Sequence, residues 1–275
     1  MVDRTTNMWI FCCGMMRSGS TVQYQITKDI VETSGTGYGL GWIEVHDFPE
    51  AYASQPYEEQ RLVVKTHAFT EKIGEVIASG EGRAIYVHRD IRDVTVSLMH
   101  KRKKSFWYIL LATPFMEMVL ENHKDWTSQP GILVSKYEEM IADLKQEVLR
   151  IANYLEIPLK ETEAEQIASK HALERQIAKV KQLETSERQS GNMLDSELLF
   201  HRNHIHSGQV GQWVNSLTTS QVRLLETLAR DTFETDRDYK GNRTSLIVVR
   251  TVKILNKVLV FSKSKLLSVR GVLSR

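Results

Sequence analysis

The sequence predicts an α/β domain, in which a parallel β-sheet is flanked by helices on both faces, followed by a basic helical extension. Short apolar runs alternate along the chain with segments of helical periodicity. Continuous apolar runs are typical of strands buried on both faces, and their alternation with helices is typical of a parallel sheet. Residues 240–275 contain nine Lys or Arg and no Asp or Glu. We therefore assign residues 1–241 to the domain and residues 242–275 to the extension.

The elements are predicted from the order of these runs. The four apolar runs expected to form strands are Trp9–Cys13, Leu62–Val64, Ala84–Val87 and Gly131–Val134. A helix carrying Val22, Ile26 and Ile30 is expected to end at Gly35, and the glycines at 35, 37, 39 and 41 predict a mobile loop. Further helices are predicted at 71–79, from about Asp93, around 140–151, over 160–200, and over 218–235, where Thr218 and Gln221 can form a capping box.

The bulk composition is that of a soluble globular protein. Of the 275 residues, 41% are hydrophobic and 25% are charged, so a core can form without disulfides or metals. Cys12 and Cys13 are adjacent on a predicted strand and should point to opposite faces as buried thiols. No Cys/His spacing suggests a metal site. The N-terminus lacks the pattern of a signal peptide, which predicts a cytoplasmic protein, and we expect no nucleic-acid partner.

A phosphate-binding loop is predicted directly after the first strand. Residues 14–21 read Gly-Met-Met-Arg-Ser-Gly-Ser-Thr and lead into a helix. Small residues let backbone N–H groups approach an anion, the helix N-terminus adds unpaired donors, and Arg17 adds a cation. The loop is P-loop-like, but no Gly-Lys-Ser/Thr closes it as in a Walker A motif. A plain turn rich in small residues is the alternative.

Three further segments carry side chains suited to anion binding or proton transfer. Lys65-Thr66-His67 ends the second predicted strand, and the third strand leads into Arg89, with Ser97 on the helix that follows. A basic, glycine-containing loop covers residues 201–213. Carboxyl ends of parallel strands open onto one ligand crevice, so the first two segments should lie near the phosphate loop. Each segment taken alone could also be an ordinary surface loop or helix start.

Together, in this order, the segments resemble the motifs of the sulfotransferases that use 3′-phosphoadenosine 5′-phosphosulfate (PAPS), particularly the cytosolic type. The resemblance spans about residues 8–236. It implies a 5′-phosphosulfate loop at 14–21, a catalytic base at His67, and a 3′-phosphate site at Arg89 and Ser97. It also implies an adenine contact at Tyr137 and a cofactor loop at 206–213. The implied cofactor-binding residues are Arg17, Ser18, Gly19, Ser20, Thr21, Arg89, Ser97, Tyr137, His206, Ser207 and Gly208.

The resemblance implies transfer of a sulfuryl group from PAPS to an acceptor hydroxyl, with 3′-phosphoadenosine 5′-phosphate (PAP) as product and no metal. His67 would take the hydroxyl proton, while Arg17 and Lys65 stabilise the leaving phosphate. Two departures stand out. Arg17 replaces the lysine usual in the family's loop, and His206-Ser207 replaces its usual Arg-Lys pair.

Two other functions remain open. A P-loop-type nucleotide phosphotransferase would share the architecture, but the missing Gly-Lys-Ser/Thr argues against it. The second is a catalytically inactive PAP-binding relative. The presence of His67 argues against it, whereas the replacement of the usual Arg-Lys pair by His206-Ser207 leaves it open.

The acceptor and the C-terminal extension are less constrained. The aromatic segment 101–126 could line an apolar acceptor pocket or simply be core. Residues 244–275 interleave apolar and basic side chains, too interrupted to span a bilayer but suited to an interfacial helix. Peripheral membrane contact through 244–275, with a lipid or glycolipid acceptor, is one expectation. Packing on the enzyme body or in a homodimer is the other.

Overall fold

A computed structural model of the chain describes residues 7–56, 58–186, 193–201, 205 and 207–233. These residues form two compact units. The first contains the described residues up to Asp90 together with those of 121–210, and the second contains Ile91–Leu120 together with the described residues that follow Val210. The expected boundary between 241 and 242 and the basic extension lie outside the described residues, so both stay predictions.

The centre of the first unit is a five-stranded sheet in which every neighbouring pair is parallel. Its spatial order is β2-β3-β1-β4-β5, so the first strand in the chain lies in the middle. The parallel sheet and its helices confirm the predicted α/β class. The strands are β1 (Met8–Gly14), β2 (Gly37–Trp42), β3 (Arg61–Lys65), β4 (Gly82–His88) and β5 (Leu133–Lys136).

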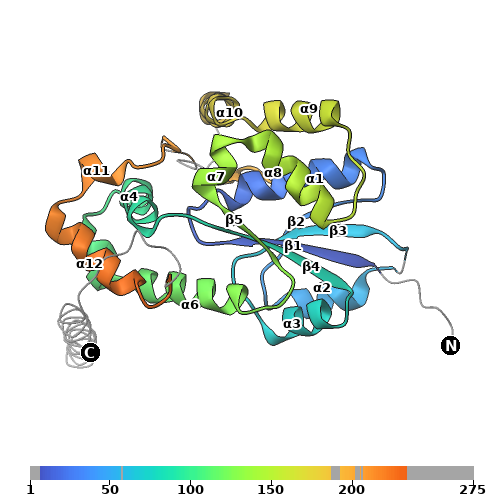
Figure 1. Cartoon of the computed structure of the whole chain (residues 1–275), viewed down its shortest axis with the longest axis horizontal. Coiled ribbons are helices and arrows are strands. Elements are labelled where there is room, and N and C mark those ends of the chain that lie inside the picture. Colours follow the sequence, from blue (N-terminus) through green and yellow to red (C-terminus); the bar gives the residue numbers. More distant parts are fainter. Residues whose placement is uncertain (1–6, 57, 187–192, 202–204, 206, 234–275) are drawn as a thin grey trace, which may run out of the picture. The chain divides into compact units, whose positions relative to one another are not determined.

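Helices cover both faces of this sheet (Figure 1). Two of them, α1 (Ser20–Thr33) and α8 (Leu144–Tyr154), lie on one face, and α2 (Phe48–Ser54) and α3 (Glu71–Ala78) lie on the other. The remaining elements of the unit are α7 (Tyr137–Ala142), α9 (Glu161–His171), α10 (Leu173–Ser186) and the antiparallel pair β6 (Met193–Asp195) and β7 (Phe200–His201). The segment 160–200 is therefore largely helical, as predicted, but ends in a hairpin.

Successive residues of β1 point to opposite faces of the sheet and contribute to two hydrophobic cores, one on each face. Ile10 and Cys12 pack on the side of α1 and α8, whereas Phe11 and Cys13 pack on the side of α2 and α3. Adjacent strand residues point to opposite faces, so the two cysteines are free, buried thiols as expected. Burial raises the pKa of the Cys12 thiol to about 12, so it stays protonated.

The predicted glycine-rich mobile loop is wrong, because Gly37, Gly39 and Gly41 lie in the edge strand β2. A side chain at position 37 would place its Cβ 1.9 Å from the Arg61 carbonyl oxygen, so only glycine lets β2 approach β3 there. The register shifts between Gly39 and Gly41, and Gly41 has a φ of 84°. Glycine here allows close pairing and a bulge, which composition alone does not distinguish from a flexible loop.

The described residues of the second unit are mainly helical. It contains α4 (Ile91–Arg102), α5 (Phe106–Ala112), α11 (Trp213–Ser216), α12 (Thr219–Ala229) and the beginning of α6 (Phe115–Thr127), which continues into the first unit. The predicted capping box is confirmed, since Thr218 accepts from the Gln221 N–H and Gln221 accepts from the Thr218 N–H. The helix ends at Ala229 rather than 235: the Thr232 N–H closes a tighter turn onto the Ala229 carbonyl at 2.9 Å, and Phe233 beyond it is buried.

Candidate active site

The candidate residues of the first unit follow the carboxyl ends of neighbouring strands. The strands β1, β3, β4 and β5 are parallel and paired in register, with Cys12 beside Lys65 and Gly14 beside Val87. Their ends therefore share one edge of the sheet, where ligands of open α/β sheets bind. Arg17, His67, Arg89 and Tyr137 follow these ends, and the contacts below connect them.

The phosphate loop is a tight turn in which two residues have positive φ. Arg17 has a φ of 70° and Gly19 a φ of 86°, both in the left-handed region. The Met15 N–H donates to the Val87 carbonyl at 2.9 Å, which fixes the loop to β4. For Arg17 this conformation is costly, and such strain persists where surrounding contacts impose it. Residues 14–19 are thus held in a fixed shape at the edge of the sheet.

Ser18 is one of the contacts that impose this shape. Its Oγ lies 2.6 Å from the Met15 carbonyl oxygen and 2.9 Å from that of Val87, and its N–H donates to Met15 at 3.1 Å. Its donors are thus engaged inside the loop, which gives Ser18 a structural role beside the cofactor contact that we expected.

Helix α1 begins at Ser20, directly after the loop. It has no side-chain cap and no acidic residue in its first turn. The first N–H that closes the helix is that of Gln23, which donates to Gly19 at 3.1 Å. The N–H groups of the first turn, including those of Ser20 and Thr21, lack intrahelical acceptors and form a local site for negative charge.

Gly19 brings this loop against Tyr137. A Cβ built at position 19 would lie 2.7 Å from Cδ2 of the Tyr137 ring and 3.1 Å from Cε of Met140. Any larger residue would push the helix α7 away from the phosphate loop. The close approach therefore requires glycine for space as well as for its positive φ.

Lys65 reaches the start of α1 from the end of β3. Its side chain is buried, its Nζ donates to Thr21 Oγ1 at 2.8 Å, and the cation lies 5.4 Å from the centre of the Trp42 ring. Burial, reinforced by the charge of Arg17, lowers the pKa of Lys65 to about 8. Burial, reinforced by Arg89, also lowers the pKa of Arg17 to about 10. These cations destabilise one another, and a bound polyanion would relieve that repulsion.

His67 is oriented by the same loop. Its Nδ1 lies 3.0 Å from the carbonyl oxygen of Gly14. A carbonyl oxygen only accepts, so we assign the ring proton to Nδ1, which leaves Nε2 with a lone pair. Burial, followed by the positive charge of Lys65, lowers the pKa of His67 to about 3. The imidazole is therefore neutral near pH 7, with one defined acceptor nitrogen.

Two tryptophans that sequence reasoning missed flank His67. Trp42, which pairs with Lys65 across β2 and β3, packs edge-on against the imidazole at 5.1 Å between ring centres. Trp126 is fully buried and donates its indole N–H to the His67 carbonyl oxygen at 2.9 Å. Both contacts join residues far apart in sequence, so no local pattern indicates them.

Arg89, Tyr137 and Gly208 form a second group of expected cofactor residues. The Arg89 guanidinium lies 4.3 Å from the centre of the Tyr137 ring and donates to the Gln209 carbonyl at 2.6 Å. The Tyr137 hydroxyl donates to the Gly208 carbonyl at 2.7 Å. Gly208 has a φ of 67°, and a Cβ there would lie 2.5 Å from Leu173. The structure thus brings Arg89, at the end of β4, and residues 208–209 of the basic loop together at Tyr137.

Glu138 supports this group and was also missed. Its Oε1 accepts the Asp90 N–H at 3.0 Å, directly beyond Arg89. Burial raises the pKa of Glu138 above its ordinary value, while the Asp90 N–H opposes the shift. The carboxylate thus fixes the turn that follows β4.

The remaining expected residues are placed as follows. Ser207 lies beside this group in the chain, and its Oγ accepts the Gln209 N–H at 3.3 Å. Ser97 is buried on α4 in the second unit. His206 lies outside the described residues. The assignment of Ser97 to the 3′-phosphate therefore still rests on its motif.

Asp93 organises the Gly-x-Trp end of the C-terminal motif within the second unit. Its carboxylate accepts the Gly211 N–H at 2.8 Å and the Trp213 N–H at 3.0 Å, and its side chain is fully buried. The Arg92 guanidinium lies 4.1 Å from the centre of the Trp213 ring and pairs with Glu226 at 2.8 Å. From the sequence, Asp93 could be read only as a helix-capping residue.

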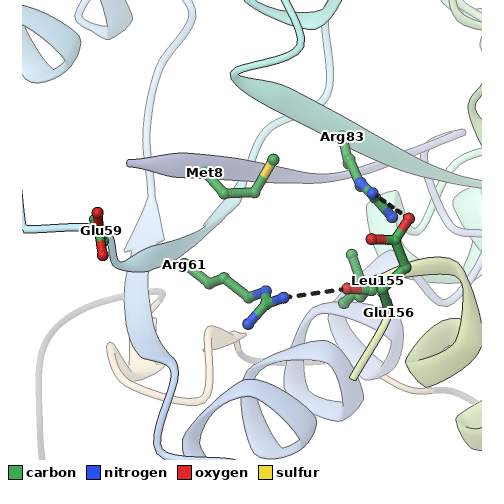
Figure 2. Close-up of a pocket in the computed structure, with 6 residues that line it drawn as sticks. All are labelled: Met8, Glu59, Arg61, Arg83, Leu155 and Glu156. Carbon is green, nitrogen blue, oxygen red and sulfur yellow. Dashed lines mark hydrogen bonds and ion pairs between the residues drawn. The ribbon is translucent and has the colours of Figure 1, made fainter. Parts of the chain in front are cut away.

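A separate cavity of about 220 Å³ lies at the opposite edge of the sheet, where the strands begin (Figure 2). It is lined by Met8, Glu59, Arg61, Arg83, Leu155 and Glu156. Arg83 forms an ion pair with Glu156 at 2.7 Å, and Arg61 reaches the Leu155 carbonyl at 3.5 Å. Internal contacts therefore engage its arginines, and none of the four sequence motifs reaches it.

The described residues hold neither a cluster of metal ligands nor a helix able to span a bilayer. No three His, Cys, Asp or Glu side chains in this part of the chain gather as a metal ion would require. Among its helices, none combines the length and the apolar character needed to cross a bilayer.

Comparison with known proteins identifies the family. The model of the sulfotransferase domain matches residues 8–237. Cytosolic sulfotransferase 11 of Arabidopsis thaliana is 26% identical over 206 residues, 68% of this chain and 55% of that protein. Sulfotransferase 2B1 of Mus musculus is 25% identical over 186 residues, 62% of this chain and 53% of that protein. The matches thus span little more than half the length of these relatives.

Solved structures agree in fold. Retinol dehydratase, in a complex with androsterone and PAP, superposes with a TM-score of 0.58 at 20% identity, covering 86% of this chain and 83% of that one. A mouse sulfotransferase in complex with PAP gives the same TM-score at 18% identity, covering 93% and 90%. The sheet, the ordered motifs and the match over residues 8–237 lead to one conclusion. The chain belongs to the sulfotransferase domain family.

Proposed function

We propose that the chain is a PAPS-dependent sulfotransferase that transfers a sulfuryl group to the hydroxyl of an acceptor and releases PAP. The observation that carries the proposal is the pairing of His67 with the phosphate loop. The Gly14 carbonyl accepts from Nδ1 at 3.0 Å, so Nε2 is the nitrogen that can accept a proton. A base tied to the loop that binds the leaving phosphate is suited to group transfer from that phosphate.

The chain's residues fit a ligand that carries two separated phosphate groups. The uncapped start of α1, Arg17 and Lys65 would hold the 5′-phosphosulfate, because cations and unpaired N–H groups meet there. Arg89, with Ser97 by motif, would hold the 3′-phosphate. A guanidinium has five donors, so Arg89 can bind a phosphate while it keeps its contact to Gln209. Tyr137 and Gly208 would border the adenine.

The proposed step is an in-line displacement. The acceptor hydroxyl oxygen forms a bond to sulfur, the bond between sulfur and the 5′-phosphate oxygen breaks, and the hydroxyl proton passes to Nε2 of His67. The products are a sulfate ester, PAP and an imidazolium that returns its proton to water. The positive charge of Lys65 helps to lower the pKa of His67, and negative charge bound beside Lys65 would offset it. The imidazole would therefore be a stronger base in the loaded site.

The acceptor is proposed only as a hydroxyl compound. Retinol dehydratase has been crystallised with androsterone and with retinol, two lipophilic alcohols, each beside PAP. Trp42 beside His67 offers an aromatic wall to a similar molecule. The same proposal places the protein in the cytoplasm. It assigns residues 244–275 to contact with a membrane surface or, alternatively, to packing on the enzyme body or in a homodimer.

Ligand-induced stabilisation separates the three functions. PAP should raise the melting temperature, because a ligand at about 100 times its Kd stabilises by about 2.7 kcal/mol. ATP with magnesium should not, since it lacks the 3′-phosphate. Stabilisation by ATP with magnesium but not PAP would favour a phosphotransferase. Stabilisation by PAP without sulfuryl transfer to any hydroxyl acceptor would favour an inactive relative.

A further inference from the structure

Helix α5 in the second unit buries one side and presents aromatic rings on the other. Phe106, Ile109 and Leu110 are at most 2% exposed, whereas Trp107 is 50% exposed and Tyr108 is 44% exposed. Large aromatic side chains exposed side by side are unusual on a soluble surface, because their burial stabilises the fold. The sequence left open whether this segment was core or acceptor pocket. The buried side chains belong to the core, and the exposed aromatic pair needs another explanation.

Basic side chains adjoin these rings. Arg102 ends α4, and Lys103 and Lys104 follow it in the turn before α5. All three are exposed, and the Lys104 ammonium lies 5.1 Å from the centre of the Tyr108 ring. No Asp or Glu occurs between Asp93 and Glu117 in the sequence. None of these three cations forms an ion pair with a carboxylate in the described part of the chain. We call residues 102–104, 107 and 108 the basic-aromatic patch.

The geometry points to an anionic lipid surface as the partner of this patch. Trp and Tyr favour the boundary between headgroups and acyl chains, where an apolar ring and a polar edge are both satisfied. Lysine and arginine beside them attract anionic headgroups, and their positive charge is complementary to such a surface. The patch contains five residues, fewer than the 20–30 per side that a specific protein interface typically uses. A bilayer needs no shaped counterpart and suits so small a surface.

This patch is distinct from the basic extension, for which the sequence already suggested a membrane contact. It extends from the end of α4 to the start of α5, inside the region that matches the family. Its binding does not require sulfuryl transfer, so a failure of the proposed function would leave it untouched. The enzyme would be recruited to the surface on which a lipophilic hydroxyl acceptor is dissolved.

Co-sedimentation of the full-length chain with vesicles tests the inference. Wild-type protein should sediment with phosphatidylcholine vesicles containing phosphatidylserine and much less with phosphatidylcholine alone. Lys103→Glu/Lys104→Glu should weaken binding to the anionic vesicles by about tenfold or more, since each basic residue near the surface contributes roughly fivefold. Trp107→Ser/Tyr108→Ser should also weaken it by about tenfold or more, since the rings are lost from the boundary between headgroups and acyl chains. Melting temperatures establish that these exposed substitutions leave the chain folded.

Matched variants separate the patch from general charge and from the extension. Val214→Ser replaces an exposed apolar residue on α11, and Lys179→Glu/Lys181→Glu makes the same charge reversal on α10. Both should bind like wild type. Patch variants that bind as well as wild type would overturn the inference, as would a loss confined to Lys253→Glu/Lys257→Glu in the extension. Binding to single-stranded RNA through the patch, without vesicle binding, would also overturn it.

Discussion

Nδ1 of His67 lies 3.0 Å from the carbonyl oxygen of Gly14, so one hydrogen bond connects the candidate base to the phosphate loop. The bond sets the tautomer, and the indole of Trp126 holds the His67 backbone from the other side at 2.9 Å. The base and the anion-binding donors are thus parts of one rigid arrangement, which favours precise proton transfer.

PAP affinity should fall above about pH 8. Burial and Arg17 place the pKa of Lys65 near 8, so its ammonium loses a proton there in the free protein and attracts the phosphate less. Binding would favour the charged form, so it should be coupled to proton uptake at alkaline pH. Calorimetry between pH 7 and 9.5 measures both, in a range where the phosphates of PAP no longer titrate. Lys65→Arg stays charged and should shift the decline to higher pH, whereas an unchanged decline would contradict the assignment.

Arg89→Ala should weaken PAP far more than adenosine 5′-phosphosulfate, which lacks the 3′-phosphate. A charge-assisted hydrogen bond of this kind contributes about 1.5–3 kcal/mol. Titration of both ligands into both proteins gives the difference. Arg83→Ala, at the opposite edge of the sheet, should leave both affinities unchanged. Equal losses for the two ligands in Arg89→Ala would mean that Arg89 does not recognise the 3′-phosphate.

Asp93→Asn should destabilise the chain by about 1–3 kcal/mol. The carboxylate accepts two N–H groups at 2.8 and 3.0 Å, and an amide would turn a donor toward one of them, leaving it buried without a partner. Asp143→Asn is the control, because that carboxylate accepts one N–H at the start of α8 and Asn caps equally well. Chemical denaturation of both variants checks this, and equal small effects would contradict the role of Asp93.

The free energy of unfolding should decrease as the pH falls from about 6.5 toward 3. Burial, with the charge of His88, lowers the pKa of His123 to about 3, so the unfolded chain binds a proton that the folded chain excludes. Stability therefore rises with pH across this range. His123→Gln can still hydrogen-bond the Tyr86 hydroxyl and should lose stability less steeply in acid. The same slope in wild type, His123→Gln and the exposed-site control His46→Gln would contradict the assignment.

Much of the fold could be predicted, because buried strands and strand ends leave local patterns. The runs that contain Ile10, Val63 and Ile85 are continuously apolar, and the sheet confirms them as strands. The edge strand β2 could not be predicted, because its glycines serve a close approach to Arg61 that only the paired strand reveals. Local composition in that segment indicates a loop just as well.

The candidate site could likewise be predicted only in part. The motifs indicated Arg17, His67 and Arg89, which follow the ends of adjacent strands. Their supports could not be predicted, because each is a contact across the sheet or between distant helices. Trp126 is 59 residues from the carbonyl it holds, and Asp93 is 118 residues from Gly211. Such pairs depend on the folded arrangement and leave no spacing in the sequence.

The most direct test of the central claim is transfer of ³⁵S from labelled PAPS to a panel of steroid, retinoid, phenol and glycolipid hydroxyl acceptors. Wild-type protein should label at least one acceptor. His67→Ala should lower that rate by about 10²–10⁴-fold while PAP still binds, since loss of a general base has an effect of this size. His46→Ala, at an exposed histidine in the same unit, should retain the full rate. Transfer by His67→Ala at the wild-type rate would contradict the account.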